Sequence, residues 1–158
     1  MPQPLVLDLL RHGQALPPGP GGDSGRPLSD SGRRALESLG ERLEREGTRH
    51  DRVFTSPLKR AVESAAAVLK AFPVHAVVET LGELAPEAAP TALLAALVKL
   101  GVAGGHTLLV GHQPLLGQLA QLLTGSVTTL APGSLLRIAC PLGAVAGTGH
   151  ILLALDPA

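Results

Sequence analysis

The chain has 158 residues with thirteen basic and thirteen acidic side chains, so its formal net charge is zero. Its only aromatic residues are two Phe, and the balanced charge together with the lack of stacking rings argues against a nucleic-acid partner. The single cysteine excludes an internal disulfide, and the length predicts one domain over residues 1–158.

No export or membrane signal is expected. The opening residues lack the basic region of a secretory signal peptide. The apolar stretches are interrupted before they reach the length of a bilayer span, as at Lys99. We therefore expect a cytoplasmic protein without a membrane partner.

The first part of the chain predicts a strand, a long loop and a helix. The apolar run over residues 4–10 reads as a buried strand that ends in a turn at Gly13. Residues 14–28 are dense in Pro and Gly and cannot form a regular element. Ser29 then predicts the N-cap of a helix with one apolar face, and Gly47 predicts its end.

A second strand and helix follow. Residues 52–55 form a short strand, and Ser56 with Pro57 predict the cap and the first position of the next helix. That helix ends before Pro73, because proline disfavours the helical conformation in the residue before it. Residues 74–78 then predict a third strand.

The second half of the chain repeats the alternation. A helical pattern over residues 91–100 leads to a strand over 106–110 and to an apolar helix after Pro114. Two last strands, 135–139 and 151–155, are joined by a turn-rich segment that is typical of a hairpin. The alternation predicts an α/β fold, a three-layer sandwich whose mostly parallel central sheet is flanked by helices and has an antiparallel edge.

Several polar residues follow the ends of different predicted strands. Arg11 and His12 follow the first strand, Ser56 and Arg60 follow the second, and His112 follows the fourth. Taken alone, Arg11 and His12 are explained equally well as solvated residues at a strand end, and Arg60 and His112 are better explained as a solvated helix residue and a turn histidine. However, the carboxyl ends of parallel strands lie at one edge, where open α/β sheets bind ligands. Two Arg and two His around a helix N-terminus predict a pocket for a dianionic phosphoryl group.

The sequence resembles the histidine phosphatase superfamily over most of its length. The resemblance is carried by residues 10–13, 26–29 with Gly32, 56–61, 81–84 and 110–114. The short chain, the Arg26-Pro27-Leu28 signature and the Glu83-Leu84 signature are most similar to bacterial phosphohistidine phosphatases of the SixA type.

This resemblance implies a mechanism. His12 would attack phosphorus as the neutral imidazole and form a phosphohistidine intermediate, which water then hydrolyses. Arg11, Arg60 and His112 would hold the phosphoryl oxygens and stabilise their charge in the transition state.

The resemblance also suggests candidates for proton transfer and substrate binding. Glu83 is the candidate proton donor by motif and Glu87 is the second, while Arg26 and Ser56 are candidate substrate-binding residues. A phosphohistidine substrate needs less help from an acid, because its imidazole is a good leaving group once protonated. No cofactor or metal is expected, since the six His residues lack the spacing of a zinc site with Asp or Glu.

Three functions remain open at this point. The first is a metal-independent phosphatase whose partner is a protein that carries phosphohistidine. The second is a phosphatase or mutase of small phosphate esters on the same fold. The third is a non-catalytic phosphate-binding module, against which the presence of His12 counts.

The lengths of the loops favour the first function. Superfamily members that enclose small esters resemble one another in carrying long insertions, whereas residues 79–90 are a short segment here. Only residues 14–28 can cover the site. An open pocket offers few contacts to a small ligand but admits a phosphoryl group that projects from a protein surface.

Overall fold

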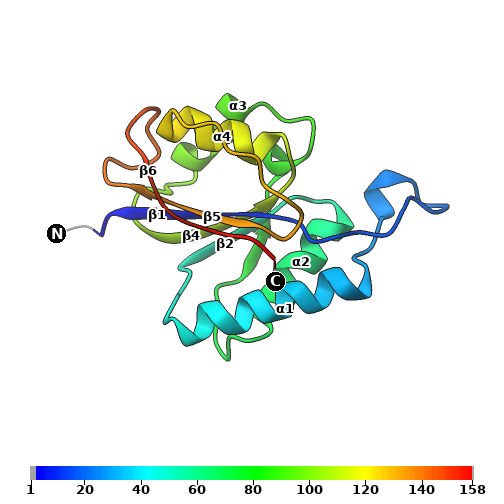
Figure 1. Ribbon diagram of the computed structural model, residues 1–158. Coiled ribbons are helices and arrows are strands. Elements are labelled where there is room, and N and C mark those ends of the chain that lie inside the picture. The colour runs from blue at the N-terminus through cyan, green and yellow to red at the C-terminus, as the bar shows by residue number, and fades with distance from the viewer. Residues whose placement is uncertain (1–2, 158) are drawn as a thin grey trace.

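A computed structural model describes residues 3–157, which form a sheet between two layers of helices (Figure 1). The strands are β1 (Leu5–Arg11), β2 (Arg52–Thr55), β3 (Val78–Thr80), β4 (Gly105–Gly111), β5 (Leu135–Cys140) and β6 (His150–Leu155). The helices are α1 (Asp30–Arg45), α2 (Lys59–Leu69), α3 (Pro90–Lys99) and α4 (Leu115–Thr124), with short 3₁₀ turns η1 (Asp23–Gly25) and η2 (Gly82–Leu84).

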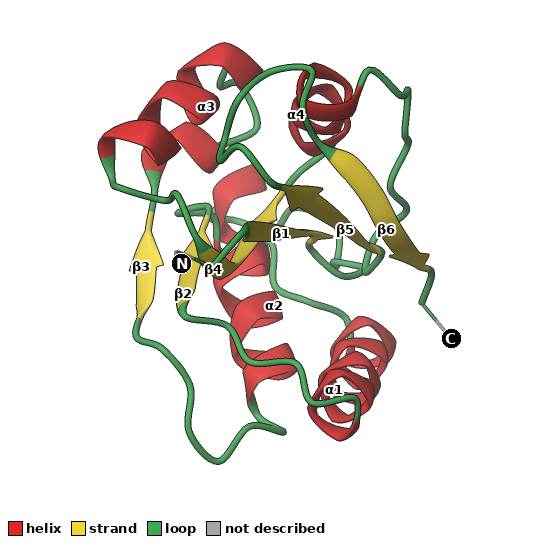
Figure 2. Ribbon diagram, turned by 90° about the vertical axis from the view of Figure 1, so that its left-hand side faces the viewer, coloured by secondary structure: helices red, strands yellow, loops and turns green. Residues whose placement is uncertain are grey.

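The six strands are arranged in the order β3-β2-β4-β1-β5-β6. The first four strands are parallel to one another, β5 is antiparallel to β1, and β6 is antiparallel to β5. Figure 2 shows β3 and β6 at the two edges, with α3 and α4 over one face and α1 and α2 over the other. The α/β class, the mostly parallel sheet and its antiparallel edge are therefore confirmed.

Strand β1 contributes to both hydrophobic cores, because its side chains alternate between the two faces of the sheet. Leu5, Leu7 and Leu9 are fully buried in the core that α3 and α4 cover. Leu10 packs in the core under α1 and α2. Asp8 falls on the same side as Leu10 and is also fully buried, so this face of the strand places a carboxylate inside the protein.

Helix α1 begins and ends as the sequence predicts. Ser29 is its N-cap, and the Ser29 hydroxyl accepts a hydrogen bond from the Gly32 amide at 3.0 Å. Gly47 follows the helix with a φ of +82°, a left-handed conformation that glycine adopts without strain. Among the described residues, no helix combines the length and the apolar character needed to cross a membrane.

The third strand lies further along the chain than the predicted range 74–78: it begins at Val78 and ends at Thr80. Residues 74–77 lie outside any strand, with Val74 and Val77 exposed and His75 in a loop. Its one neighbour among the described residues is β2, whose pairing with β3 begins at Val53 and Val78. An edge strand without a partner has nothing to hydrogen-bond, so a strand-like sequence there stays irregular.

Helix α2 begins two residues later than the Ser56-Pro57 motif predicts. Its N-cap is Leu58, which is extended, and no side chain caps it. The Ser56 amide instead donates to the Val110 carbonyl at 2.9 Å, so pairing with the neighbouring strand continues past β2. This places Arg60 within the first turn of α2 and leaves the Ser56 hydroxyl available to a side chain.

Residues 14–28, called the arm here, contain more structure than their Pro and Gly content predicts. Two isolated bridges, Ala15 with Leu28 and Gly19 with Gly22, fold the arm back on itself, and η1 lies near its end. In Figure 1 the arm extends beyond the carboxyl end of β1. The arm is thus a folded projection that returns to the sheet edge.

Candidate active site

The structure brings five of the predicted site residues to one edge of the sheet: Arg11, His12, Ser56, Arg60 and His112. Arg11 is the last residue of β1 and pairs with Gly111, so His12 and His112 follow neighbouring strands at the same level. Ser56 follows β2 directly, and Arg60 lies in the first turn of α2. The predicted shared edge is confirmed by the strand register.

The His12 ring is held in a defined orientation. Its Nδ1 lies 2.7 Å from the Gly13 carbonyl oxygen, which can only accept a hydrogen bond, so Nδ1 carries the proton. Its Nε2 lies 3.4 Å from Nε of Arg60, which donates to it. Both contacts place a lone pair on Nε2, and this is the form of imidazole that acts as a nucleophile.

The surroundings keep His12 uncharged. Burial lowers the pKa of His12 to about 4, the hydrogen bond to the Gly13 carbonyl acts in the opposite direction, and the nearby Arg60, Arg11 and Arg26 lower it further. Only 7% of the residue is exposed, so water stabilises the charged ring poorly. The ring is therefore neutral at physiological pH. No separate base is needed to prepare Nε2 for attack.

His112 lies next to His12, with 5.0 Å between the ring centroids. Its Nε2 is 2.8 Å from Oγ of Ser56, and this oxygen also accepts from the Leu58 amide. The Ser56 hydroxyl also has a hydrogen that it can donate to Nε2, and in that tautomer the ring proton of His112 lies on Nδ1. Nδ1 of His112 is buried without a hydrogen-bond partner among the described residues, so it is a donor that an incoming oxyanion can use.

Burial is also the main reason that the pKa of His112 is lowered, to about 3, and the neighbouring His12 and Arg60 lower it further. A bound dianion would act in the opposite direction, because an opposite charge favours the protonated ring. His112 is thus a neutral donor in the free protein whose proton affinity rises when a phosphoryl group is present.

Two guanidinium groups supply positive charge. Arg11 donates from Nη1 to the Leu130 carbonyl at 2.8 Å, while its Nε is buried and unpartnered among residues 3–157. Burial and then the charge of Arg60 lower the pKa of Arg11. Arg60 is itself only 5% exposed. Arg60 is buried and Arg11 is partly buried, and two neighbouring cations that repel each other gain from an anion between them, which favours a phosphoryl ligand.

The arm brings a carboxylate, Asp23, to this group. Arg60 donates to the Asp23 carbonyl at 2.8 Å and to its carboxylate at 3.3 Å, and Arg26 contacts the same carboxylate at 3.3 Å. The hydrogen bond from Arg26 is the main cause that lowers the pKa of Asp23, and Arg60 adds to it. Sequence reasoning did not select Asp23, since only the folded arm brings it to Arg60.

The predicted proton donor lines a hollow that none of these His and Arg residues lines. Glu83 lies in η2 and lines a hollow beside α3 together with Ala92 and Lys99. Leu84, the next residue, is fully buried in the core. Within residues 3–157, no hydrogen bond or ion pair joins Glu83 or the second candidate, Glu87, to the two His and two Arg residues.

Sequence comparison identifies the family. A profile of the histidine phosphatase superfamily (branch 1) matches residues 7–85, which include the ends of β1 and β2 and the start of α2. The chain belongs to the histidine phosphatase superfamily. No curated protein matches the sequence of this histidine phosphatase.

Solved structures share the fold of this histidine phosphatase over nearly the whole chain. The protein histidine phosphatase SixA complexed with tungstate is 24% identical with a TM-score of 0.84, covering 96% of this chain and 97% of that one. A SixA structure from Agrobacterium tumefaciens is 20% identical with a TM-score of 0.81, covering 98% and 99%. One from Nakamurella multipartitia is 22% identical with a TM-score of 0.79, covering 99% of each chain. At these identities the likeness concerns the fold.

A second buried polar cluster lies away from this edge, and sequence reasoning did not find it. It consists of Asp8, His50, His106 and Arg137 and is called the Asp8 cluster below. Burial by itself raises the pKa of Asp8, but the contacts from His106, His50 and Arg137 together hold that pKa well below its ordinary value. Asp8 lies four residues before His12 on an extended strand, about 13 Å away. The one sequence signal was an acid inside an apolar run, because a buried carboxylate requires partners.

Proposed function

We propose that this histidine phosphatase removes phosphoryl groups from phosphohistidine in proteins, with His12 as the nucleophile. The observation that carries the proposal is the ionisation of Asp23. Among the described residues, its carboxylate is the only one with a hydrogen bond or ion pair to Arg11, His12, Arg60 or His112. Arg26 and Arg60 keep its pKa low, so Asp23 is ionised at neutral pH and is a poor proton donor. A site without a good acid suits a substrate whose leaving group needs little protonation.

The chemistry follows from the orientation of the rings. His12 Nε2 attacks phosphorus and forms a new P–N bond, while the P–N bond to the substrate imidazole breaks and that imidazole takes up a proton from solvent water. Water then attacks the phosphorus of phosphorylated His12, which releases inorganic phosphate and restores the free ring. Arg11, Arg60 and His112 bind the phosphoryl oxygens in both steps, where their charge and hydrogen bonds stabilise the transition state.

The surroundings of the site support a protein substrate. The segment between β3 and α3 is short and contains only the single turn η2. The arm forms the rim, and its Asp23 side chain is 61% exposed. Such a rim leaves room for a phosphorylated side chain presented by another protein, and the fold likeness to SixA agrees with this substrate class.

Covalent labelling tests the nucleophile. Protein quenched in acid after brief incubation with ³²P-labelled phosphohistidine substrate should carry phosphate that is labile to acid and stable to base. His12→Ala should lose the label and lower turnover by several powers of ten. His75→Ala is the matched control, because His75 is an exposed loop residue. Near-normal turnover by His12→Ala would exclude His12 as the nucleophile.

Comparison of substrates tests the specificity. We expect kcat/KM to be higher for a protein domain that carries phosphohistidine than for phosphoglycerates or sugar phosphates. The reason is that an ionised Asp23 cannot protonate a leaving alkoxide. A clear preference for one small ester would instead assign the protein to the ester phosphatases and mutases of this fold, even if His12 is the nucleophile. Binding of phosphate without turnover of any substrate would indicate a non-catalytic module.

A further inference from the structure

We propose that Asp8, His50 and His106 form a binding site for a divalent first-row transition metal ion such as Zn²⁺. The Nε2 atom of His50 lies 2.8 Å from Oδ2 of Asp8, and Nε2 of His106 lies 2.9 Å from the same oxygen. The three candidate ligand atoms all lie within 4.8 Å of one another. The site is separate from the candidate active site and does not depend on the proposed function.

The fold creates this group from three distant segments. Asp8 lies in the middle of β1, and His106 lies near the start of the adjacent β4, two residues before Leu108, the partner of Asp8. His50 comes from the connection between α1 and β2, 42 residues from Asp8 in the sequence. Since each ligand belongs to a different segment, the sequence contains no motif of closely spaced ligands that would predict the site.

The donor set matches the chemistry of such ions. Two imidazole nitrogens and one carboxylate oxygen are typical ligands of Zn²⁺ and its neighbours in the first transition row, and three protein ligands leave a position for water. The arrangement of Asp8 and His106 also points to a missing partner. Nε2 of His106 is buried and lies 2.9 Å from Oδ2 of Asp8, but the two atoms do not meet the geometry of a hydrogen bond, so Nε2 has no hydrogen-bond partner among the described residues.

A second layer of contacts orients the carboxylate. Arg137 donates from Nε to Oδ1 of Asp8 at 2.7 Å and from Nη2 to Oδ2 at 3.0 Å. The same Nη2 lies 3.2 Å from the Thr48 hydroxyl, which holds the guanidinium in place. Groups that hydrogen-bond to a ligand fix its orientation and tune its affinity for metal, and Arg137 takes that position here.

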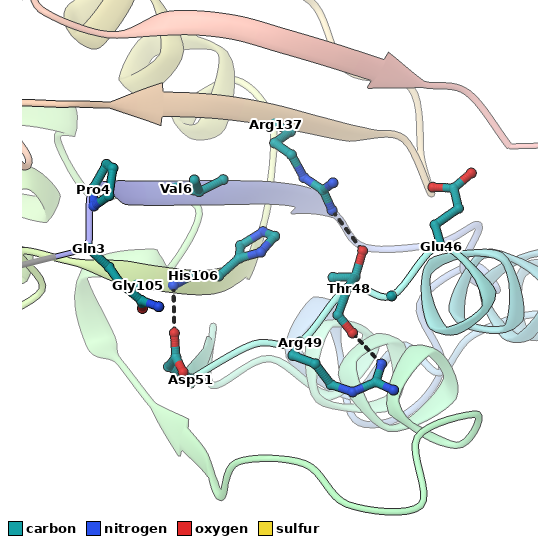
Figure 3. A pocket seen from close by; sticks show the side chains of 11 residues that line it. Gln3, Pro4, Val6, Glu46, Thr48, Arg49, Asp51, Gly105, His106 and Arg137 are labelled. Carbon is teal, nitrogen blue, oxygen red and sulfur yellow. Dashed lines mark hydrogen bonds between the residues drawn. The ribbon is translucent and has the colours of Figure 1, made fainter.

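A hollow gives the ion a way in. It has a volume of about 530 Å³ and lies at the amino end of the sheet, lined by His106 and Arg137 together with Glu46, Arg49 and Asp51 (Figure 3). Figure 3 shows His106 and Arg137 projecting into the space between the sheet and the segment that carries Thr48. The His106 side chain is 18% exposed, so the edge of the site reaches solvent.

The local charge also permits a cation. Asp8, Glu46 and Asp51 contribute three negative charges, and Arg49 and Arg137 contribute two positive charges. With neutral His ligands the surroundings therefore carry one net negative charge, which attracts a divalent cation. Arg137 is included in this count, and its ion pair with Asp8 reduces the negative charge that Asp8 presents to an ion.

Metal titration of the full chain tests the proposal. After metal is removed with a chelator and the chelator by dialysis, Co²⁺ should bind with a stoichiometry of one and produce visible absorption bands, which Zn²⁺ then displaces. His106→Ala should weaken Co²⁺ binding by roughly 100-fold or more, since losing a ligand exceeds the 10–100-fold cost of outer-shell changes. A variant with both His75→Ala and His150→Ala removes two exposed histidines and should bind as the wild type does.

Three results would overturn the proposal. These are no binding by the wild type, equal binding by wild type and His106→Ala, and loss of binding in the double control, which would indicate surface adsorption. If His106→Ala does not fold, as judged by circular dichroism, the wild type still decides the question. Anomalous diffraction from a crystal soaked in Zn²⁺ should place the ion between Asp8, His50 and His106. An ion at any other position, or none, would refute the site.

Discussion

Replacing Arg60 by lysine separates two possible roles of this residue. The guanidinium contacts three acceptors at once: Nε reaches Nε2 of His12, Nη1 reaches the Asp23 carbonyl, and Nη2 reaches the Asp23 carboxylate. Lysine keeps the positive charge but has one nitrogen, so it cannot hold a phosphoryl oxygen and a second partner in a planar fork. We therefore expect Arg60→Lys to damage catalysis much more than folding.

The size of each effect can be estimated from these contacts. Losing one donor aimed at charge that develops in the transition state lowers the rate by roughly 10²–10³, or about 2.7–4 kcal/mol. The contacts with Asp23 contribute little to stability, because the Asp23 side chain is 61% exposed and solvent screens the ion pair. The remaining hydrogen bond joins Nε of Arg60 to Nε2 of His12. Its loss would lower the free energy of unfolding by about 1 kcal/mol and Tm by about 2–4 °C.

The assay measures kcat/KM on a phosphohistidine-bearing domain together with thermal melting. Arg34→Lys is the matched control, since Arg34 is exposed on α1 and should change neither quantity. An unchanged kcat/KM for Arg60→Lys would show that Arg60 is not part of the phosphoryl site. A large fall in Tm that accounts for the lost activity would show that Arg60 acts mainly in folding.

Four further predictions concern the pH dependence of activity, the pH dependence of stability, helix packing and metal removal. Because His12 is active when neutral and its pKa is lowered to about 4, kcat/KM should persist below pH 6 and decline only toward pH 4, whereas a midpoint near 6.5 would contradict the buried environment. The folded-state pKa values of His12 and His112 lie below the unfolded value, so the free energy of unfolding measured in urea should decrease as pH falls from about 6.5 toward 4, and a flat profile would argue against buried neutral rings. Gly40→Ala should destabilise the fold by about 1–3 kcal/mol, since a Cβ there would overlap the Val68 backbone carbonyl; an unchanged denaturation midpoint would contradict the close packing of α1 on α2. Exhaustive chelation should leave kcat unchanged, because the Asp8 cluster lies far from the phosphoryl site. Activity that is lost on chelation and restored by Zn²⁺ or Mg²⁺ would refute a metal-independent reaction.

The sequence by itself determined the fold class and the edge at which the candidate active site lies. Both follow from signals that are local in the chain. Apolar periodicity marks the strands and helices, and Ser29 marks a helix start whatever surrounds it. The placement of Arg11, His12 and His112 then follows from geometry, because residues just after parallel strands meet at one edge.

Other features were decided by partners that are distant in sequence. The third strand begins at Val78, where its pairing with β2 begins. Ser56 is not the N-cap of α2, because its amide donates to the Val110 carbonyl of the neighbouring strand. Glu83 lies beside α3 while the adjacent Leu84 enters the core, and the folded arm brings Asp23 to Arg60.

The Asp8 cluster shows most clearly which features the sequence determines and which depend on the tertiary structure. The sequence shows an acid within an apolar strand, and the cost of burying a carboxylate implies that partners exist. Their identity depends on which strands lie beside β1 and on the path of the chain between α1 and β2. Local preferences determine which elements form, whereas contacts between buried polar groups are determined only when the tertiary structure places those elements side by side.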